Sequence, residues 1–252
     1  MAYDGRPFRG FARQPNFKTV QGELESALST LFGTEVQTYG AGRTDAGVHA
    51  LAQVVSCPTA PDEVDFDRVV RVVNAMCGPS IVVSSCRPVN DDWHARFSAR
   101  SRSYVYAISQ TPTISPFLAG TTLHEPHPLD VDAMNEAAGH LVGERDFSSF
   151  GRVPEDGSAV RTLHELRVTR AASIVRVYAR ANSFIYQMVR SLVGTLLDVG
   201  RTKTPPDSML EILRAGDRAA AGPVAPPYGL CLVAVEYDDG WSRPVDLTQP
   251  RG

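Results

Sequence analysis

Residues 40–50 most limit how this chain can fold, because they read GAGRTDAGVHA and must turn tightly between two extended segments. The flanking residues 35–39 and 53–57 are alternating apolar runs, which predicts strands. Three glycines among eight residues indicate tight turns and a close approach of the backbone to another group. Asp45 is the one carboxylate of this stretch, and a lone Asp in such a turn most often bonds only its own backbone. The local pattern therefore leaves the role of Asp45 open.

Helical periodicity occurs on both sides of this turn. It predicts helices over residues 19–31 and 66–76, the first with Thr19 as its N-cap and Gly33 as its stop. A further strand is expected at residues 81–85, and the end of another at Tyr3. The first half therefore has the order β-α-β-β-α-β, which is ferredoxin-like.

The second half again mixes strands and helices. Strands are expected at residues 102–108, 161–170, 173–181 and 230–237, and helices at residues 130–141 and 184–199. We interpret this half as a diverged copy of the first. The expected fold is α+β with two related domains, residues 1–98 and 99–252.

Composition excludes several classes of protein. No run approaches 18 apolar residues, so no transmembrane helix is expected, and the N-terminus lacks the apolar core of a signal peptide. The four cysteines show no C-x-x-C spacing, which favours free thiols in a reducing cytoplasm over disulfides or zinc ligands. Pro126 between His124 and His127 indicates a loop, so no metal site is expected there.

The formal net charge of −3 does not indicate nucleic-acid binding, but the charges are unevenly distributed. Residues 161–190 contain six Arg and one acid, Glu165. Alternation places Arg176, Tyr178 and Arg180 on one face of a strand, and we call these three residues the basic stripe. The stripe is a candidate for phosphate contacts, and a merely solvated strand face is the alternative.

Six segments resemble one known family. Residues 42–50, GRTDAGVHA, resemble the catalytic loop of the tRNA pseudouridine synthase A family. Residues 3–11, YDGRPFRGF, resemble the family's opening Y-D-G-x-x-F-x-G-W, with Phe11 in place of Trp. The remaining matches, in the family's order, are HARFSA at 94–99, DFSSF at 146–150, FIYQMVR at 184–190 and GLCLVAV at 229–235.

The resemblance implies a pseudouridine synthase fold, with a mixed, mainly antiparallel sheet and the active-site cleft between the two domains. It implies that Asp45 is the catalytic nucleophile, that Arg190 balances its charge and that Tyr104 stacks on the uracil and handles the C5 proton. Leu230 would form the apolar floor under the base. Arg43 would fill the space that a flipped nucleotide vacates.

The implied reaction breaks the N1–C1′ bond of uridine, turns the uracil and joins C5 to C1′. It transfers no electrons and no external group, so no cofactor and no metal are expected. Attack at the sugar, attack at the base and elimination through a glycal remain open. By resemblance the substrates are uridines 38, 39 and 40 in the anticodon arm of tRNA, and the enzyme is a cytoplasmic homodimer without a membrane anchor.

Two other functions stay open at this stage. Only two residues precede Tyr3, so the first strand is expected to be shortened, and an RNA-binding protein that has lost catalysis would fit that defect. We expect another segment or a partner chain to cover the neighbouring sheet edge. A nucleoside or glycoside hydrolase is the second alternative, although such enzymes use two paired carboxylates and residues 40–50 offer one.

Overall fold

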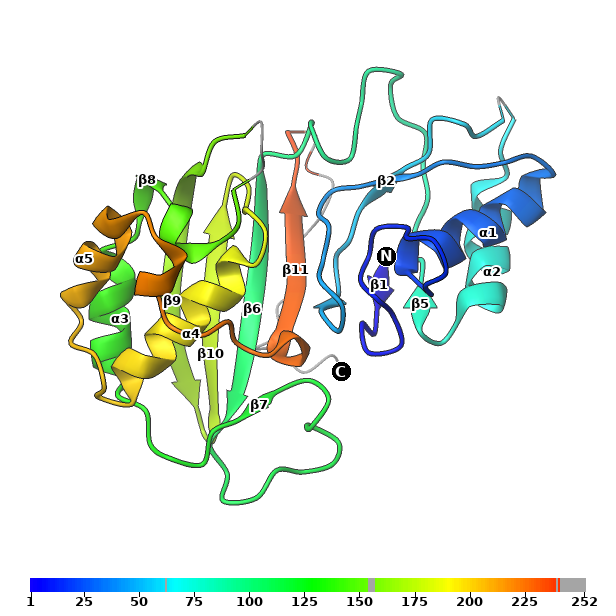
Figure 1. The fold of residues 1–252 in the computed structure, drawn as a ribbon. Helices are drawn as coiled ribbons and strands as arrows, with labels where there is room; N and C mark the ends of the chain where they lie inside the picture. The colour runs from blue at the N-terminus through cyan, green and yellow to red at the C-terminus, as the bar shows by residue number, and fades with distance from the viewer. Residues whose placement is uncertain (62, 154–156, 239, 241–252) are drawn as a thin grey trace. The chain divides into compact units, whose positions relative to one another are not determined.

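The computed structural model describes residues 1–61, 63–153, 157–238 and 240 (Figure 1). Contacts divide the chain into two compact units: unit 1 is Met1–Arg100 with the chain from Cys231 onward, and unit 2 is Ser101–Leu230. The sequence placed the boundary after residue 98 and assigned the last strand to the second domain. In the structure Cys231 and Leu232 pair in parallel with residues 49 and 50 of unit 1, a partner that local sequence does not reveal.

Both helices predicted for the first half of the chain are present in unit 1. In α1 (Val20–Phe32) the hydroxyl of Thr19 accepts a hydrogen bond from Gly22 N at 3.2 Å, and Gly33 ends the helix with a left-handed φ of 72°. The helix α2 (Phe66–Cys77) begins at Asp65, whose side chain accepts from Arg68 N. These ends were predictable because residues within the same turn determine them.

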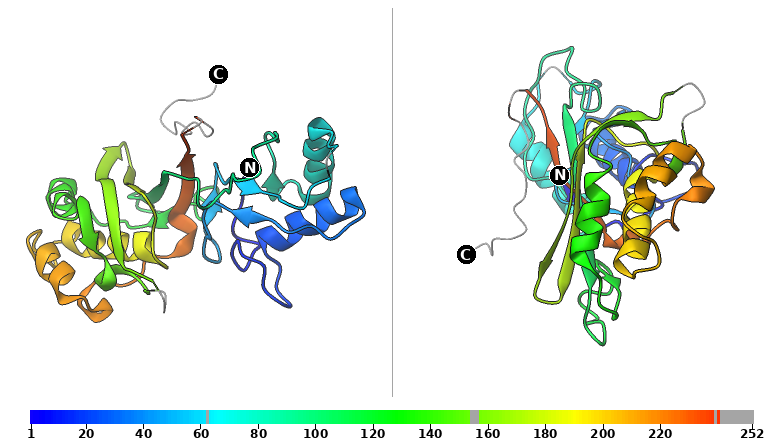
Figure 2. Two further views of the ribbon diagram at one scale, coloured as in Figure 1. Left: turned by 90° about the horizontal axis from the view of Figure 1, so that it is seen from above. Right: turned by 90° about the vertical axis from the view of Figure 1, so that its left-hand side faces the viewer.

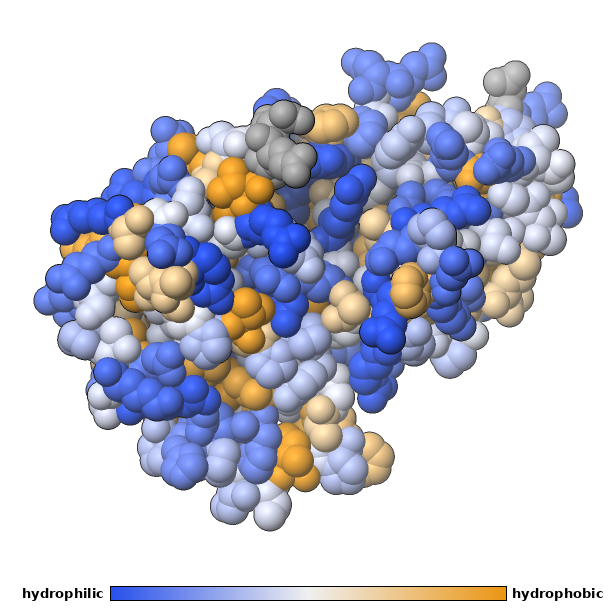
Figure 3. All heavy atoms as spheres, viewed as in Figure 1, coloured by the Kyte–Doolittle hydropathy of each residue, from blue (hydrophilic) through white to orange (hydrophobic). Residues whose placement is uncertain are grey.

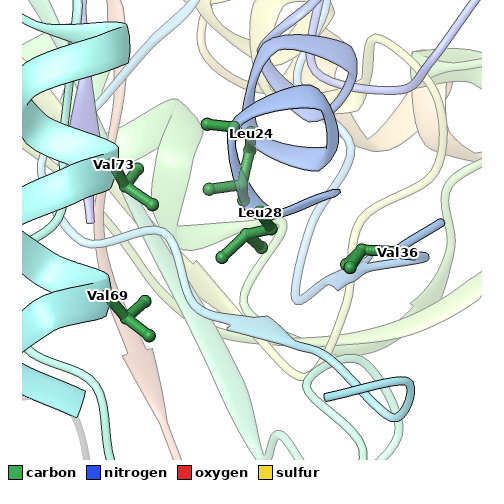
Figure 4. Close-up of a cluster of buried hydrophobic side chains, with 6 residues drawn as sticks. Leu24, Leu28, Val36, Val69 and Val73 are labelled. Carbon is green, nitrogen blue, oxygen red and sulfur yellow. The ribbon is translucent and has the colours of Figure 1, made fainter. Parts of the chain in front are cut away.

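A small hydrophobic core holds α1 against α2. Leu24 and Leu28 face Val69 and Val73, with Val36 beside them, and all are at most 6% exposed (Figure 4). Burial of each such side chain stabilises the fold by about 1.5–3 kcal/mol. Val36 therefore anchors the chain shortly before residues 40–50.

The strands of unit 1 lie in the order β5-β1-β3-β11, with bounds Ile81–Val82, Ala2–Tyr3, His49–Ala50 and Leu230–Glu236. The strand β1 is short, as expected, and it pairs antiparallel with β3 on one side and β5 on the other. The edge beside the shortened strand is thus covered by β5. The sequence did not predict β3, because its partners β1 and β11 come from opposite ends of the chain.

The strands expected on either side of residues 40–50 are shorter than predicted. They reduce to β2 (Tyr39–Gly40) and β4 (Val55–Ser56), which pair with each other. The reason is that the preceding backbone is bonded to side chains: Gln37 N donates to Thr59 Oγ1 at 3.1 Å, and Thr38 N donates to Glu25 Oε1 at 2.9 Å.

Unit 2 contains longer strands. The strands β6 (Ser101–Ser109), β10 (Ile174–Ala181), β9 (Val160–Ala171) and β8 (Gly143–Asp146) are antiparallel neighbours in that order, and β7 (Leu123–His124) pairs in parallel with β6. With the parallel β3–β11 pair, this confirms the α+β class and the mixed, mainly antiparallel pairing. The predicted hairpin around Ala171 and Ala172 is also confirmed.

The helices of unit 2 are α3 (Val131–Gly139), α4 (Met188–Gly200) and α5 (Ser208–Ala215). They gather on one face of the strands (Figure 2). The helix α4 begins at Met188, four residues later than predicted, because Gln187 has a left-handed φ of 63° that a helix cannot contain.

Viewed as in Figure 1, the surface is mainly hydrophilic, and the described residues expose hydrophobic side chains (orange) in small separate groups (Figure 3). Small groups of this kind are normal on a protein surface. Within the described ranges, we found no helix of the length and apolar character needed to cross a membrane.

Candidate active site

The turn that carries Asp45 is held by the first residues of the chain. The hydroxyl of Tyr3 lies 2.8 Å from Thr44 Oγ1, and Phe11 N donates to Thr44 O at 3.0 Å. Thr44 is buried and immediately precedes Asp45, which is partly buried, whereas Arg43 is exposed. A carboxylate in this position is placed by rigid neighbours and remains partly accessible to a substrate.

Two glycines let the opening segment approach this turn. Gly10 has a φ of +99°, and a Cβ there would lie 3.0 Å from Thr44 O and 3.4 Å from Asp45 C. A Cβ at Gly5 would lie 2.1 Å from Val48 O, closer than real atoms allow. The Y-D-G-x-x-F-x-G pattern therefore has a physical role, since its glycines allow backbone to pack on the catalytic candidate from both sides.

His49 completes this support. Its Nδ1 accepts a hydrogen bond from Gly5 N at 3.2 Å and lies 3.3 Å from the carboxylate of Asp4. The guanidinium of Arg6 donates to Asp4 and holds the pKa of that carboxyl below its usual value, although partial burial opposes the shift. His49 is 9% exposed, so it supports the turn rather than facing a substrate.

In unit 2, Tyr104 lies on β6 and is 8% exposed. Its ring meets that of Phe184 edge to face, with centroids 5.3 Å apart and planes at 87°. Phe184 opens the F-x-x-x-M-V-R segment, so this contact joins the segment that carries Arg190 to the strand that carries Tyr104. Phe184 belongs to that motif, but the sequence alone predicts no role for it.

Arg190 lies in the first turn of α4 and is partly buried. Its Nε donates to Ala225 O at 2.7 Å, and Ala225 N donates to Arg190 O at 3.0 Å. One turn later, a Cβ at Gly194 would lie 1.6 Å from Pro223 O, so only glycine permits this close approach. The segment 223–225 therefore orients the guanidinium, a support that the sequence reasoning missed.

Leu230 is 5% exposed and follows a short 3₁₀ turn, Pro227–Gly229. Tyr106 holds that turn, because its hydroxyl donates to Pro226 O at 2.9 Å and its ring would lie 2.7 Å from a Cβ at Gly229. Burial raises the pKa of Tyr106 far above its usual value, so the phenol stays protonated as a donor. Tyr104 and Tyr106 share one strand face, but their roles differ: Tyr106 supports the turn before Leu230.

The basic stripe lies on the opposite face of the strands from Tyr104. On β10 the neighbour of Tyr104 is Ala179, and the stripe residues alternate with it. Arg180 Nε lies 3.9 Å from Glu165, and the guanidinium of Arg167 lies 4.7 Å from the ring centroid of Tyr178. The three stripe residues share one strand face, as predicted, and Glu165 partly neutralises their positive charge. The structure does not bring the stripe together with Tyr104.

Two other features are separate from these residues. Within the described residues, no three His, Cys, Asp or Glu side chains gather as they would around a metal, and His124 bonds the carbonyl of Thr111. A cavity of about 330 Å³ in unit 1 is lined by Arg87, Asn90, Trp93 and other residues of 87–98 with Tyr237 and Asp238. None of its lining residues belongs to the candidate site, so we assign no chemistry to it.

Comparison with known proteins gives consistent results. A family model described as tRNA pseudouridine synthase matches residues 1–98 and 137–238. A tRNA pseudouridine synthase A of Brevibacillus brevis is 44% identical over 240 residues, which cover 94% of this chain and 97% of the relative. One of Burkholderia mallei is 43% identical over 243 residues, covering 96% and 90%. A chain of the crystal structure of a Cbf5-Nop10-Gar1 complex has 13% identity and a TM-score of 0.35 over 90% of this chain and 47% of that chain, a similarity too low to support an argument.

Proposed function

This chain belongs to the tRNA pseudouridine synthase family, and from that premise we propose that it converts uridine to pseudouridine at positions 38, 39 and 40 of the tRNA anticodon arm. The observation that carries the proposal is the match of both halves to the family, together with an Asp45 turn held rigidly by the opening segment. The reaction is an isomerisation: every heavy atom of the uracil is retained, C5 loses a proton and N1 gains one, and no co-reactant is consumed.

Asp45 is the proposed nucleophile. Attack at C1′, attack at C6 and elimination through a glycal all require a carboxylate held at the reacting nucleotide. The bonds to Thr44 and the close packing of Gly10 keep this carboxylate in place before the substrate arrives. Such positioning lowers the activation barrier because less freedom is lost in the reaction.

The other proposed residues act around the same uridine. Arg190 supplies the positive charge that balances the carboxylate, and its bond to Ala225 orients it for this role. Tyr104 stacks on the uracil and handles the proton at C5, while Leu230 gives the base an apolar surface. Arg43, exposed on the Asp45 turn, fills the space left by the flipped nucleotide.

The basic stripe is proposed to contact tRNA phosphates away from the reacting base. Support comes from its three partly exposed side chains on one strand face, with Arg167 beside them. Because the stripe lies on the face opposite Tyr104, we propose that it contributes to affinity rather than to chemistry.

The test is a nucleotide-resolution map of pseudouridine in tRNA treated with the protein, compared with treated uridine nucleoside. Product only in tRNA, at positions 38–40, supports the proposal. Asp45→Asn should abolish product while leaving tRNA affinity within severalfold, because affinity comes mainly from phosphates. The matched control Asp91→Asn changes an exposed carboxylate of unit 1 and should act like the parent protein.

Other outcomes would contradict the proposal. Free uracil would indicate a hydrolase, and tRNA binding without product would indicate an RNA-binding protein that has lost catalysis. Substantial product from Asp45→Asn would remove Asp45 from the nucleophile role.

We further propose that the protein acts in the cytoplasm as a homodimer, with one tRNA contacting both subunits. The basis is the family membership. Sedimentation should give twice the chain mass of 27.3 kDa, and a monomer at micromolar concentration would contradict this part.

A further inference from the structure

A row of three aromatic rings lies on unit 1 and begins at Tyr39, immediately before residues 40–50, and the proposed chemistry does not use it. It consists of Tyr39, His94 and Phe97, which we call the stacking row. We propose that the stacking row binds an unpaired base of the RNA substrate, with Phe97 as the ring on which the base stacks. This proposal rests on the proposed function for the identity of the RNA.

The backbone under the stacking row is held on both sides at Ala95. Ala95 is fully buried; its N–H donates to Ser56 Oγ at 3.2 Å, and its carbonyl accepts from Tyr237 Oη at 2.6 Å. Ser56 lies on β4, directly paired with Tyr39 of β2. The segment with His94 and Phe97 is therefore fastened to the strand that carries Tyr39.

Local hydrogen bonds also orient the rings. His94 Nδ1 accepts from Arg96 N at 3.0 Å and from Phe97 N at 3.4 Å, which sets the imidazole plane. Ser98 closes the turn, since its N–H donates to His94 O at 2.9 Å and its hydroxyl accepts from His94 N at 3.0 Å. The row is thus built before any ligand is present, and binding would cost little side-chain freedom.

The geometry of the rings suits a nucleobase. The centroids of Tyr39 and His94 lie 4.9 Å apart, those of His94 and Phe97 lie 4.5 Å apart, and the planes are tilted by 36° and 40°. The end of the row is open, because Phe97 is 76% exposed and Tyr39 is 43% exposed. A large aromatic side chain left in water at the end of an ordered row is a surface on which a further flat ring gains stacking energy.

The positive charge beside Phe97 and the position of Tyr39 in the chain favour RNA as the ligand of the stacking row. The guanidinium of Arg96 lies 5.4 Å from the centroid of Phe97, and an aromatic ring with an adjacent Arg is the usual combination for an unpaired nucleotide. Tyr39 directly precedes Gly40, where the turn with Arg43 and Asp45 begins. The row therefore adjoins, at Tyr39, the start of the turn that carries the proposed chemistry. We assign the row an unpaired nucleotide of the RNA substrate.

The test compares the affinity of an anticodon stem-loop with that of a fully paired RNA of equal length. Phe97→Ala should weaken stem-loop binding about 5- to 100-fold, as expected for loss of one stacked base. Binding of the paired RNA and the salt dependence should not change, because no phosphate contact is removed. Phe97→Trp should retain or increase the affinity. 2-Aminopurine placed in the loop should be quenched by the parent protein and not by Phe97→Ala.

Phe117→Ala is the matched control, since Phe117 is 92% exposed in unit 2 and outside the row. It should leave both affinities unchanged. Equal stem-loop affinity of Phe97→Ala and the parent protein would overturn the proposal, as would a change in self-association without a change in RNA binding. Pseudouridine formation by the parent protein tests the proposed function separately. If the parent protein forms pseudouridine and Phe97→Ala binds the stem-loop equally well, only the stacking-row proposal is wrong. Phe97-dependent binding without product removes only the proposed activity, and no RNA binding by the parent protein removes both.

Discussion

At the scale of single residues, the Asp45 turn depends on the glycines that face it as much as on its own side chains. Gly10 and Gly33 both have left-handed φ values, +99° and +72°. A Cβ at Gly33 meets nothing within 4 Å, whereas one at Gly10 meets Thr44 O, Ala46 N and Asp45 C at 3.0–3.4 Å. An alanine would therefore strain the backbone at both positions, but only at Gly10 would its Cβ also push against the backbone around Asp45.

Gly10→Ala should lower kcat for pseudouridine formation by about tenfold or more, because a displacement of a few tenths of an ångström misplaces the carboxylate. Gly33→Ala should leave kcat unchanged while costing about 1–2 kcal/mol of stability from the same backbone strain. Single-turnover kinetics and urea unfolding measure the two effects. Equal kcat values for the two variants would show that the contact with the opening segment does not position Asp45.

At the scale of elements, the two faces of the unit 2 strands carry residues with two different proposed functions. Tyr104 and Tyr106 share the face on which the helices pack, and the basic stripe occupies the other. Changing Arg176 and Arg180 to Gln should reduce the slope of log K against log salt for tRNA by up to about 2, less any share already neutralised by Glu165. A control with Arg71 and Arg214 changed to Gln removes the same charge from exposed helix positions. Equal slopes for the two double variants would leave the stripe a solvated strand face.

The ends of β7 and α4 are joined by a partly buried ion pair. Arg201 donates to Glu125 through Nε at 2.8 Å and also through Nη2, and the Glu125 side chain is 7% exposed. Burial raises the pKa of Glu125, but the hydrogen bonds and charge of Arg201 outweigh it, with help from His127, so the net pKa is lowered from 4.5. An acid whose pKa is lower when folded stabilises the fold above its unfolded pKa, and this stability is lost as the pH falls below about 4.5.

Glu125→Gln should therefore cost about 1.5–3 kcal/mol near pH 7, the range for a hydrogen bond to a charged group. The difference from the parent protein should shrink as the pH falls below about 4.5, because the unfolded parent then binds a proton at this carboxyl that the folded parent binds only at lower pH. Urea unfolding at a series of pH values measures it, with Glu144→Gln on the exposed strand β8 as the control. A difference that stays constant down to pH 3 would contradict this account of the ion pair.

At the scale of the whole molecule, sequence reasoning succeeded where neighbouring residues determine the structure. The caps of α1, the start of α2 at Phe66 and the face shared by the basic stripe follow from residues within a few positions. It missed β3, because His49 and Ala50 become a strand only through partners at the two ends of the chain. It also missed the late start of α4, because no local pattern reveals that Gln187 has a left-handed φ. It did not predict that the basic stripe and Tyr104 lie on opposite faces, because that depends on the register between β6 and β10. The supports of the site, Tyr106 and the close approach at Gly194, likewise depend on contacts between distant segments.

We expect the two units to unfold at different urea concentrations. All four cysteines, Cys57, Cys77, Cys86 and Cys231, belong to unit 1, and burial raises their thiol pKa values, that of Cys231 to about 12. Labelling at pH 8 should therefore become faster when unit 1 opens, because the thiols of the folded protein are partly buried and their raised pKa values keep them mainly protonated.

Unit 1 should open first. Apart from β11 its strands are two residues long, whereas β6, β9 and β10 of unit 2 have 9, 12 and 8 residues, and α4 is buried along almost its whole length. Regions with fewer buried contacts and shorter ladders open at lower free energy. Labelling with a thiol reagent across a urea series should give a midpoint below that of the far-ultraviolet circular dichroism, to which the long strands and α4 of unit 2 contribute most. Bound tRNA should raise the labelling midpoint, because the Asp45 turn and the stacking row both lie in unit 1. Coincident midpoints in the absence of tRNA would show instead that the chain unfolds as one cooperative body.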